Sequence, residues 1–519
     1  MIAKKNKILH ALLGIALIAF GRASWIWQLA PLCAVCGYAF LWHATEGTTK
    51  RALSLWALFS LANLIHLHWL LSHPFLYIIA VWVVLSFFLA LPYALISIWV
   101  VARPLSLFRI LGLAALFALV EWSFTMFPCG FSFQTAALHL SWNPFSLQLA
   151  SICGALGLSF LVFLTNLFFY SWMQTSIFGI HALCLAVLPY FLGGWLYTSR
   201  SIEQQKSNLS PLRAAICYMD EAPDVNFSHL SPYELHEYKW QQIFSLLLKP
   251  TTSNHALDLI ILPEGAVPYP AQSPLFRSQH LPSHLSYAHP SSLLSSLELA
   301  RLVARSHNAS MLIGLESQNG QSSTNACFFI SPTYSHTERY DKQLLLPFGE
   351  YIPLSCLRSF LKQYGVFESF SAGGGAKLLD SNNLRLAPLI CYEETFSSYT
   401  RKAAHLNPTC LVSLNNDAWF PDSRLKDEHL EQARLRAVEV GIPLLRSCNK
   451  GISCGIDGLG RISRQGKNGH SSLIVSLSRY SPFSLFLLVG EESIVSLLVF
   501  IALFSFCMDR YLQRLRYNP

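Results

Sequence analysis

Long apolar stretches fill the first 200 residues of the chain and restrict what it can fold into. A helix that crosses a bilayer needs roughly 20 apolar residues, and seven stretches reach or approach this length. An eighth stretch lies near the C-terminus. The eight stretches span about 8–23, 26–43, 52–72, 75–100, 105–126, 147–172, 177–198 and 493–507. We therefore expect a multi-helix integral membrane protein with about eight transmembrane helices.

Charge is scarce in this apolar part and is mostly positive. Residues 1–200 hold 11 of the 66 charged side chains, and nine of the 11 are Lys or Arg. The rest of the chain is close to neutral, so the net charge of +8 comes from the apolar part. This distribution excludes a simple soluble enzyme, and it gives no basis for a nucleic-acid partner.

The basic residues near the helix ends predict the orientation, because cytoplasmic loops are enriched in Lys and Arg. With eight helices they all fall on one face, which is the cytoplasmic face. They are Lys4, Lys5, Lys7, Lys50, Arg51, Arg103, Arg109, Arg510, Arg514 and Arg516. Both termini are then cytoplasmic, and residues 199–492 lie outside. In a bacterium this is the periplasmic face of the inner membrane.

Residues 205–480 have the alternating pattern of one α/β domain. The β-rich runs are 213–219, 257–262, 310–316, 326–331, 384–391, 410–415 and 444–448, separated by helical patterns at 232–248, 291–306 and 426–440. In the last helix, Glu428, Glu431, Arg434 and Arg436 lie largely on the polar face. The expected domains are a membrane domain of seven helices at 1–200, an outer domain at 205–480, a last transmembrane helix at 493–508 and a basic cytoplasmic tail at 509–519.

Three residues suited to catalysis follow predicted strands. Cys391 ends the run 384–391, Glu264 follows the run 257–262, and Lys342 lies beyond the run 326–331. A nucleophile at a strand end is held by a rigid element, beside backbone N–H groups that can bind an oxyanion. The 13 cysteines lack paired spacing, so they predict neither a disulfide framework nor a metal site.

Taken together, the segments around these residues resemble the nitrilase, or carbon–nitrogen hydrolase, superfamily. They are Leu262-Pro263-Glu264, Tyr340-Asp341-Lys342, Leu346 to Pro353 and Cys391-Tyr392-Glu393. The resemblance implies an αββα sandwich with a catalytic triad of Glu264, Lys342 and Cys391. It also implies that Glu350 orients Lys342 and that Tyr392, Glu393, Trp240 and Asn325 support the site. From the sequence alone, Trp240, Asn325 and Glu393 fit a structural role better.

The membrane part narrows the resemblance to the apolipoprotein N-acyltransferase family. The matching segments are Glu121-Trp122, Gly130-Phe131, 148–160, 415–420, 433–439 and 446–453. Ser132-Phe133 departs from the Pro-Trp that this family often has. The implied reaction moves the sn-1 acyl chain of a phospholipid, expected to be phosphatidylethanolamine, through a thioester on Cys391 to the amine of an S-diacylglyceryl cysteine. Glu264 acts as base, and Lys342 lowers the thiol pKa and binds the oxyanion. No cofactor is expected, and the protein is expected to be a monomer with diacylglyceryl lipoproteins as acceptors.

Three alternative functions depend on other features of the chain. Gly451 to Gly455 spells the G-x-S-x-G elbow of serine hydrolases, but turn-forming residues follow it, so a hairpin is expected instead. A membrane-anchored amidase would share the triad but needs at most one helix. A transporter or receptor with an inactive outer domain is unsupported, because Glu121 is the only acidic residue inside a predicted span.

Overall fold

The computed structural model describes residues 2–127, 130–221, 229–247, 256–285, 292–320, 322–333, 337–353, 370–381, 384–466 and 469–517. The chain forms two compact units. The helical unit comprises Met1–Glu203, Asp422–Glu439 and Phe483–Pro519, and the α/β unit comprises Gln204–Pro421 and Val440–Pro482.

Within the described residues, the helical unit contains six helices that are long and apolar enough to cross a membrane. They are α4 (Arg51–His66, extended by a 3-10 segment to Ser72), α5 (Tyr77–Val101), α6 (Leu107–Met126), α9 (Ala150–Thr175), α10 (Gly179–Lys206) and α17 (Glu491–Tyr517). They match six of the eight predicted spans. The predicted tail after residue 508 continues α17 as helix to Tyr517.

The first two predicted spans are shorter in the structure. The first is α1 (Ile2–Phe20), whose apolar part is Asn6–Phe20. The second is broken into α2 (Ala30–Leu32), a π-helical turn (Cys33–Gly37) and α3 (Tyr38–Ala44). A π-helical turn interrupts the regular hydrogen-bond ladder. The side chain of Asn166 satisfies the freed groups, accepting from Tyr38 N at 2.9 Å and donating to Ala34 O at 2.9 Å. The total of eight spans is therefore not confirmed.

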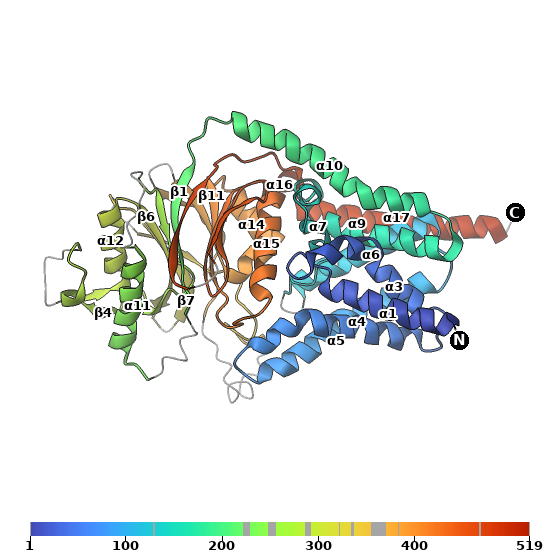
Figure 1. Ribbon diagram of the computed structural model, residues 1–519, viewed down its shortest axis with the longest axis horizontal. Coiled ribbons are helices and arrows are strands. Elements are labelled where there is room, and N and C mark those ends of the chain that lie inside the picture. Colours follow the sequence, from blue (N-terminus) through green and yellow to red (C-terminus); the bar gives the residue numbers. More distant parts are fainter. Residues whose placement is uncertain are drawn as a thin grey trace. The chain divides into compact units, whose positions relative to one another are not determined.

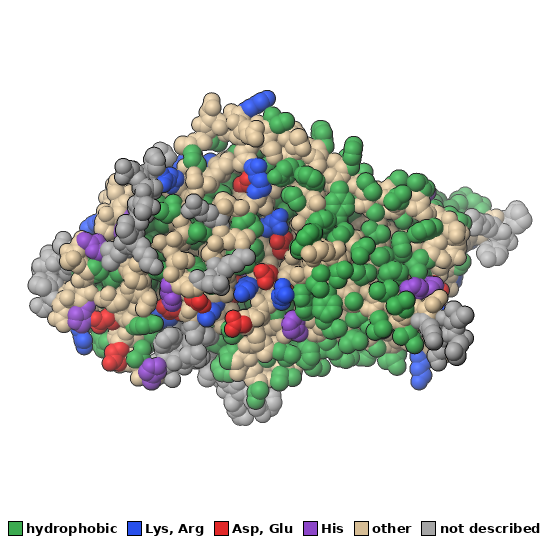
Figure 2. Space-filling model, viewed as in Figure 1, with side chains coloured by type: hydrophobic (Ala, Val, Ile, Leu, Met, Phe, Trp, Pro, Cys, Tyr) green, Lys and Arg blue, Asp and Glu red, His purple; other side chains and the backbone are tan. Residues whose placement is uncertain are grey.

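Hydrophobic side chains cover the exposed faces of these helices (Figure 2). On α10, for example, Ile180, Leu183, Phe191 and Trp195 are all more than half exposed. Soluble proteins rarely expose such continuous apolar surface, whereas lipid-facing helices require it. This is the surface of a membrane protein.

One helix of the helical unit comes from the middle of the predicted outer domain. It is α15 (Leu425–Val440), which follows β11 and precedes β12 in the chain. Glu428 of α15 lies 3.4 Å from Arg22 Nη1 and 3.3 Å from His66 Nε2, and all three side chains are buried. The predicted polar face of this helix is therefore buried among polar partners of the helical unit.

Two large mixed β-sheets and a small two-stranded sheet of β4 (Pro274–Arg277) and β5 (Leu293–Ser295) form the described part of the α/β unit (Figure 1). The first has the order β15-β1-β2-β6-β7-β8, with β3 also paired to β6; the second has the order β14-β13-β12-β11-β10-β9. The first contains β1 (Leu212–Tyr218), β2 (Leu259–Ile261), β3 (Val267–Pro270), β6 (Ser310–Asn319), β7 (Ser322–Ile330), β8 (Thr337–Asp341) and β15 (Ser471–Leu477). The second contains β9 (Leu379–Ser381), β10 (Leu384–Ile390), β11 (Cys410–Asn416), β12 (Leu444–Asn449), β13 (Ser453–Ile456) and β14 (Ile462–Gly466). Parallel pairs form the centre of each sheet: β1-β2-β6 in the first and β10-β11-β12 in the second.

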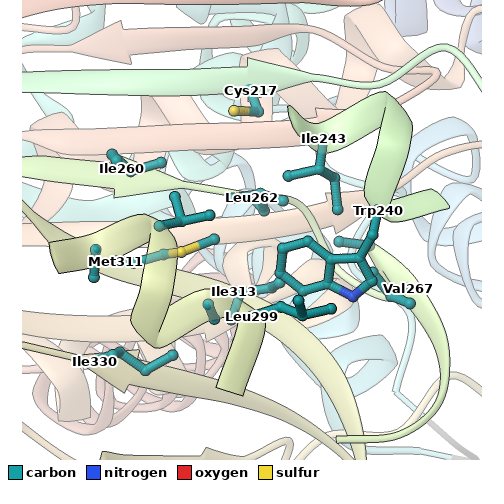
Figure 3. Close-up of a cluster of buried hydrophobic side chains, with 14 of the residues drawn as sticks. Cys217, Trp240, Ile243, Ile260, Leu262, Val267, Leu299, Met311, Ile313 and Ile330 are labelled. Atoms are coloured by element: carbon teal, nitrogen blue, oxygen red, sulfur yellow. The ribbon is translucent and has the colours of Figure 1, made fainter. Parts of the chain in front are cut away.

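Hydrophobic layers join the sheets to each other and to their helices. Side chains such as Ile216, Leu312 and Val412 pack together between the two sheets. On the outer face of the first sheet, α11 (Pro232–Leu247) and α12 (Ser296–His307) cover a second core, which includes Trp240 (Figure 3). On the second sheet, α14 (Ser397–Ala404) packs against β10. The predicted α/β domain is confirmed.

All seven predicted β-rich runs are strands: β1, β2, β6, β7, β10, β11 and β12. The hairpin expected at the G-x-S-x-G segment is also present, since β12 and β13 pair antiparallel. Ser453 is buried there, and its hydroxyl accepts a hydrogen bond from Cys448 N at 2.9 Å. The strands that the sequence did not predict include β8 and β9, which are short and lie at sheet edges.

Candidate active site

The three predicted catalytic residues all follow the ends of strands. Glu264 follows β2 by three residues, Lys342 directly follows β8, and Cys391 directly follows β10. β2 and β8 belong to the first sheet and β10 to the second. The two sheets face each other, so the three segments meet. The side-chain contacts and charge interactions described below connect them.

Lys342 lies between two carboxylates. Its Nζ is 3.0 Å from Glu264 Oε1 and 3.0 Å from Glu350 Oε1. Asn325 on β7 joins the same two oxygens, with Nδ2 at 2.7 Å from Glu264 and 2.8 Å from Glu350. All four side chains are buried. Glu350 is held in turn by Leu346 N, which donates to its Oε2 at 2.7 Å. The structure thus brings Glu264, Lys342, Glu350 and Asn325 into one hydrogen-bonded cluster.

A glycine in the neighbouring strand makes room for the Glu264 segment. A Cβ added at Gly314 of β6 would lie 2.5 Å from Pro263 O and 2.6 Å from Glu264 Cα. Any other residue would displace the backbone that carries Glu264, because contacts this short are sterically forbidden. β6 and the Glu264 segment therefore depend on this close approach.

Cys391 begins a 3-10 turn, Cys391–Thr395, in a left-handed conformation with φ of 51°. Its side chain is half-buried, whereas Glu264 and Lys342 are buried. The backbone N–H of Asn416, the last residue of β11, donates a hydrogen bond to the sulfur. Cys391 is thus the more accessible residue at the edge of a buried polar cluster.

The surroundings of the thiol favour its neutral form at rest. Burial raises the pKa of Cys391 well above its ordinary value, and the carboxylate of Glu264 raises it further. The ammonium of Lys342 acts in the opposite direction but does not outweigh them. The charge of Lys342 therefore acts on the thiol pKa in the direction expected from the sequence, but burial and Glu264 outweigh it. The thiol needs a base at the moment of attack.

Glu264 is suited to be that base. Burial raises the pKa of its carboxyl group, the nearby Glu350 adds to the shift, and Lys342 opposes it. A raised pKa makes a carboxylate a better proton acceptor. Burial alone would favour the neutral amine of Lys342, but Glu264 and Glu350 outweigh it and hold the pKa of Lys342 well above its usual range. Lys342 is accordingly a stable positive charge.

Glu393 connects the segments that carry Lys342 and Cys391. Its carboxylate accepts from Gln343 N at 2.6 Å, next to Lys342, and from Ile390 N at 2.7 Å, next to Cys391. The hydroxyl of Tyr340 donates to the same carboxylate at 2.9 Å. Tyr392 is buried, with its ring 4.9 Å from that of Phe396. Glu393 therefore holds the site together without being exposed to a substrate.

Trp240 lies in the core between α11 and the first sheet (Figure 3). Its Nε1 donates to Ser296 Oγ at 3.1 Å, and its ring contacts Phe244. The same core includes Leu262, which leads into the Glu264 segment. The supporting role predicted for Trp240 stays a prediction, since these contacts belong to the core.

A second buried ionic cluster beside Cys391 was missed by the sequence analysis. Arg446 on β12 donates through Nε to Glu394 Oε1 at 2.9 Å and through Nη1 to Ile452 O at 2.6 Å. Its Nη2 is 3.7 Å from Asp417 Oδ2. The available signal was an arginine inside an apolar strand, because a buried charge requires a partner. Among the described residues, no group of three or more His, Cys, Asp or Glu side chains could hold a metal ion.

Two family models match the chain. Residues 212–478 match the carbon-nitrogen hydrolase model, and residues 14–168 match the model of the apolipoprotein N-acyltransferase N-terminal domain. The first match covers the whole cluster described above, and the second covers much of the helical unit.

Curated relatives match along most of the chain. An apolipoprotein N-acyltransferase of Chlamydia caviae is 28% identical, with 88% of each chain covered. One of Chlamydia pneumoniae is also 28% identical, with 96% of this chain and 95% of the relative covered. One of Photobacterium profundum is 33% identical over 41% of this chain and 40% of the relative.

Solved structures resemble the α/β part more distantly. A CN-hydrolase superfamily protein from Xanthomonas campestris is 15% identical with a TM-score of 0.37, covering 52% of this chain and 91% of that one. A nitrilase-superfamily amidase from Nesterenkonia is 16% identical with a TM-score of 0.37, covering 55% of this chain and 96% of that one.

Proposed function

We propose that this chain, which belongs to the carbon–nitrogen hydrolase family, N-acylates the N-terminal S-diacylglyceryl cysteine of lipoproteins in a bacterial membrane. The match over residues 212–478 gives the family. The second family model and the relatives named apolipoprotein N-acyltransferase indicate the branch of this family. The resemblance expected from the sequence is thereby confirmed, and the protein is an acyltransferase.

The observation that carries the catalytic proposal is the position of Lys342 between two buried carboxylates, beside a half-buried thiol. Lys342 Nζ is 3.0 Å from both Glu264 and Glu350. Glu264 can exchange a proton with the reacting groups, and Glu350 keeps the ammonium of Lys342 charged and in place. A base, a cation and a nucleophile at one site are the groups that acyl transfer through a covalent intermediate requires.

In the first half-reaction, Glu264 takes the thiol proton as Cys391 Sγ attacks the carbonyl carbon of the phospholipid sn-1 ester. The carbonyl oxygen becomes an oxyanion, which Lys342 and the backbone N–H of Tyr392 stabilise. When this intermediate collapses, the carbon–oxygen bond to the glycerol breaks. The leaving oxygen takes the proton from Glu264, which releases a lysophospholipid and leaves a thioester.

In the second half-reaction, the neutral α-amine of the diacylglyceryl cysteine attacks the thioester carbonyl. Glu264 accepts the proton that the amine loses, and Lys342 again stabilises the oxyanion. The carbon–sulfur bond then breaks, and the thiolate takes the proton from Glu264. The products are an amide and the free thiol, so no metal, nucleotide or other cofactor enters the balance.

The donor and the monomeric state in the proposal are expectations from the family resemblance, and the orientation is an expectation from the charge distribution. The acyl donor is phosphatidylethanolamine, the protein acts as a monomer, and the α/β unit lies on the periplasmic side of the inner membrane with both termini in the cytoplasm. The distribution of Lys and Arg at the helix ends supports this orientation. Glu350, Asn325 and Glu393 orient the triad through the hydrogen bonds described above.

The test is transfer by the purified full-length protein in vesicles. Phosphatidylethanolamine labelled in its sn-1 chain and a synthetic S-diacylglyceryl cysteine peptide are supplied together. We expect labelled N-acyl peptide and one lysophospholipid per transfer, with no product from the Cys391→Ser variant. Labelled free fatty acid in place of the N-acyl peptide would instead indicate that the acyl-enzyme discharges onto water, as in a hydrolase, and would contradict the proposal.

A further inference from the structure

Asn416 lies next to the segments that carry the base and the nucleophile, and it is not one of the predicted site residues. It ends β11, and its side chain is half-buried. Its backbone N–H donates to the sulfur of Cys391. A Cβ added at Gly265, the residue after Glu264, would lie 3.9 Å from Asn416 Nδ2. The amide group of Asn416 is therefore next to both reacting segments.

Two hydrogen bonds determine which way this amide group faces. Its Oδ1 accepts from Ala418 N at 3.2 Å and from Asn449 Nδ2 at 3.1 Å. A backbone N–H can only donate, so the atom that faces Ala418 must be the oxygen. The nitrogen Nδ2 then faces the opposite way, toward Gly265.

The partner that holds Asn416 is itself fixed. The side chain of Asn449 accepts from Glu221 N at 2.9 Å and donates to Glu221 O at 3.1 Å. Asp417 N also donates to Asn449 O at 2.9 Å. The orientation of Asn416 thus depends on Asn449 of β12 and on backbone groups that follow the ends of β1 and β11.

Within the described residues, Nδ2 of Asn416 donates to no protein atom, whereas Oδ1 accepts twice. Polar groups in such partly enclosed positions are normally paired with protein or with a ligand. The three residues around Nδ2 are also the accessible ones of the site: Gly265 is exposed, and Cys391 and Asn416 are half-buried. This donor therefore lies on the accessible side of the site, next to the residue that carries the sulfur.

We propose that Asn416 contacts the substrate, with Nδ2 donating a hydrogen bond to an oxygen of the acyl ester while Cys391 attacks it. This inference rests on the proposed function and adds a donor to the triad. An ester oxygen gains negative charge during the attack, and a fixed N–H group beside it stabilises that charge. No proton is transferred to or from Asn416, so the balance of the reaction is unchanged.

The test compares two reactions of the same sulfur in the full-length protein in vesicles. One is acylation by labelled phosphatidylethanolamine without acceptor, followed as labelled protein; the other is alkylation by iodoacetamide, which contains no ester. In Asn416→Ala, the backbone N–H to the sulfur remains and Nδ2 is lost. We expect acylation to slow about 100-fold, as for loss of one oxyanion donor, with an unchanged alkylation rate.

A second variant controls for the possibility that Asn416→Ala loses activity because it misfolds. Asn416→Asp keeps the size and the accepting oxygen but removes the donor, and its ratio of acylation to alkylation rates at a given pH should also fall. Asn415→Ala is the matched control, because that side chain, on the same strand, donates to Ser413 Oγ at 3.0 Å. It should acylate at the wild-type rate.

The outcomes separate the two proposals. An unchanged acylation rate in Asn416→Ala, or an equal loss of acylation and alkylation, would overturn the role of Asn416 and leave the proposed function standing. A wild-type protein that alkylates but never takes up the acyl label would overturn the proposed function itself.

Discussion

Cys391 combines a strained backbone with a protonated resting state. Its φ of 51° lies in the left-handed region, which costs a non-glycine residue about 1–2 kcal/mol. The buried carboxylate of Glu393 holds the turn by accepting from Ile390 N, just before Cys391, and from Gln343 N, just after Lys342. Such strain persists only where the surroundings fix it. The same contacts set the nucleophile next to its base, which raises the thiol pKa.

Glu264→Gln should change two properties of Cys391 in opposite directions. Removing the carboxylate charge removes a cause that raises the thiol pKa, so the pKa falls and alkylation at a given pH becomes faster. Acyl transfer should nevertheless fall about 100- to 10,000-fold, because the general base is lost. The measurements are the pH profile of iodoacetamide alkylation and the rate of peptide N-acylation.

Glu234→Gln is the control for this change, because Glu234 is exposed in the first turn of α11. It should alter neither profile. Slower alkylation in Glu264→Gln, or acyl transfer at the wild-type rate, would contradict the role of Glu264 as base.

The sequence predicted the residues of the cluster better than their electrostatics. Glu264, Lys342 and Cys391 each follow a strand, and family resemblance added Glu350, Asn325 and Glu393. The net direction of the thiol pKa could not be predicted, because it depends on burial and on the distance to Glu264. Asn416 and Arg446 were missed as site residues, since their roles arise from contacts between neighbouring strands.

At the scale of elements, apolar runs predicted strands well and helix faces less well. Buried parallel strands are apolar on both faces, so β1, β2, β10, β11 and β12 stand out in the sequence. For α15, the spacing of the charged residues predicts a polar face, yet Glu428, Glu431 and Arg436 are buried. Arg434, on the same predicted face, is half-buried. Periodicity separates polar from apolar residues but does not reveal polar partners such as Arg22. Edge strands such as β9 have too few residues for a clear pattern.

Ser453→Ala tests the hairpin formed by β12 and β13. The variant loses the hydrogen bond that Ser453 Oγ accepts from Cys448 N. We expect a loss of about 1 kcal/mol in the free energy of unfolding and no loss of acyl transfer, measured by thermal unfolding and the peptide assay. A folded variant without activity would instead favour a serine nucleophile in the G-x-S-x-G segment.

At the scale of the whole molecule, the two units differ in how they meet their surroundings. The helical unit exposes apolar side chains over α10 and α17, as lipid contact requires. The α/β unit buries its apolar residues in two layers, one between its sheets and one beneath α11 and α12. The sequence predicted this division from composition, whereas the short first two helices and the place of α15 emerged only from packing.

Cysteine labelling tests the membrane assignment and its orientation. Cys184 on α10 and Cys507 on α17 are exposed in the protein, and Cys391 is half-buried in the α/β unit. In spheroplasts, a membrane-impermeant maleimide at alkaline pH should label Cys391 and leave Cys184 and Cys507 unmodified until the lipid is dissolved. Peptide mapping by mass spectrometry gives the answer. Labelling of Cys184 in intact membranes, or of Cys391 only after lysis, would contradict the assignment.

In the proposed reaction the acyl chain passes through Cys391, and the mass of the protein itself reports this step directly. After incubation with phosphatidylethanolamine of defined acyl chains and no acceptor, we predict one added acyl group, mapped to Cys391 and sensitive to hydroxylamine. Adding the diacylglyceryl cysteine peptide should remove this mass and yield N-acyl peptide. An acyl group on another residue, or N-acyl peptide formed by Cys391→Ser, would contradict the account.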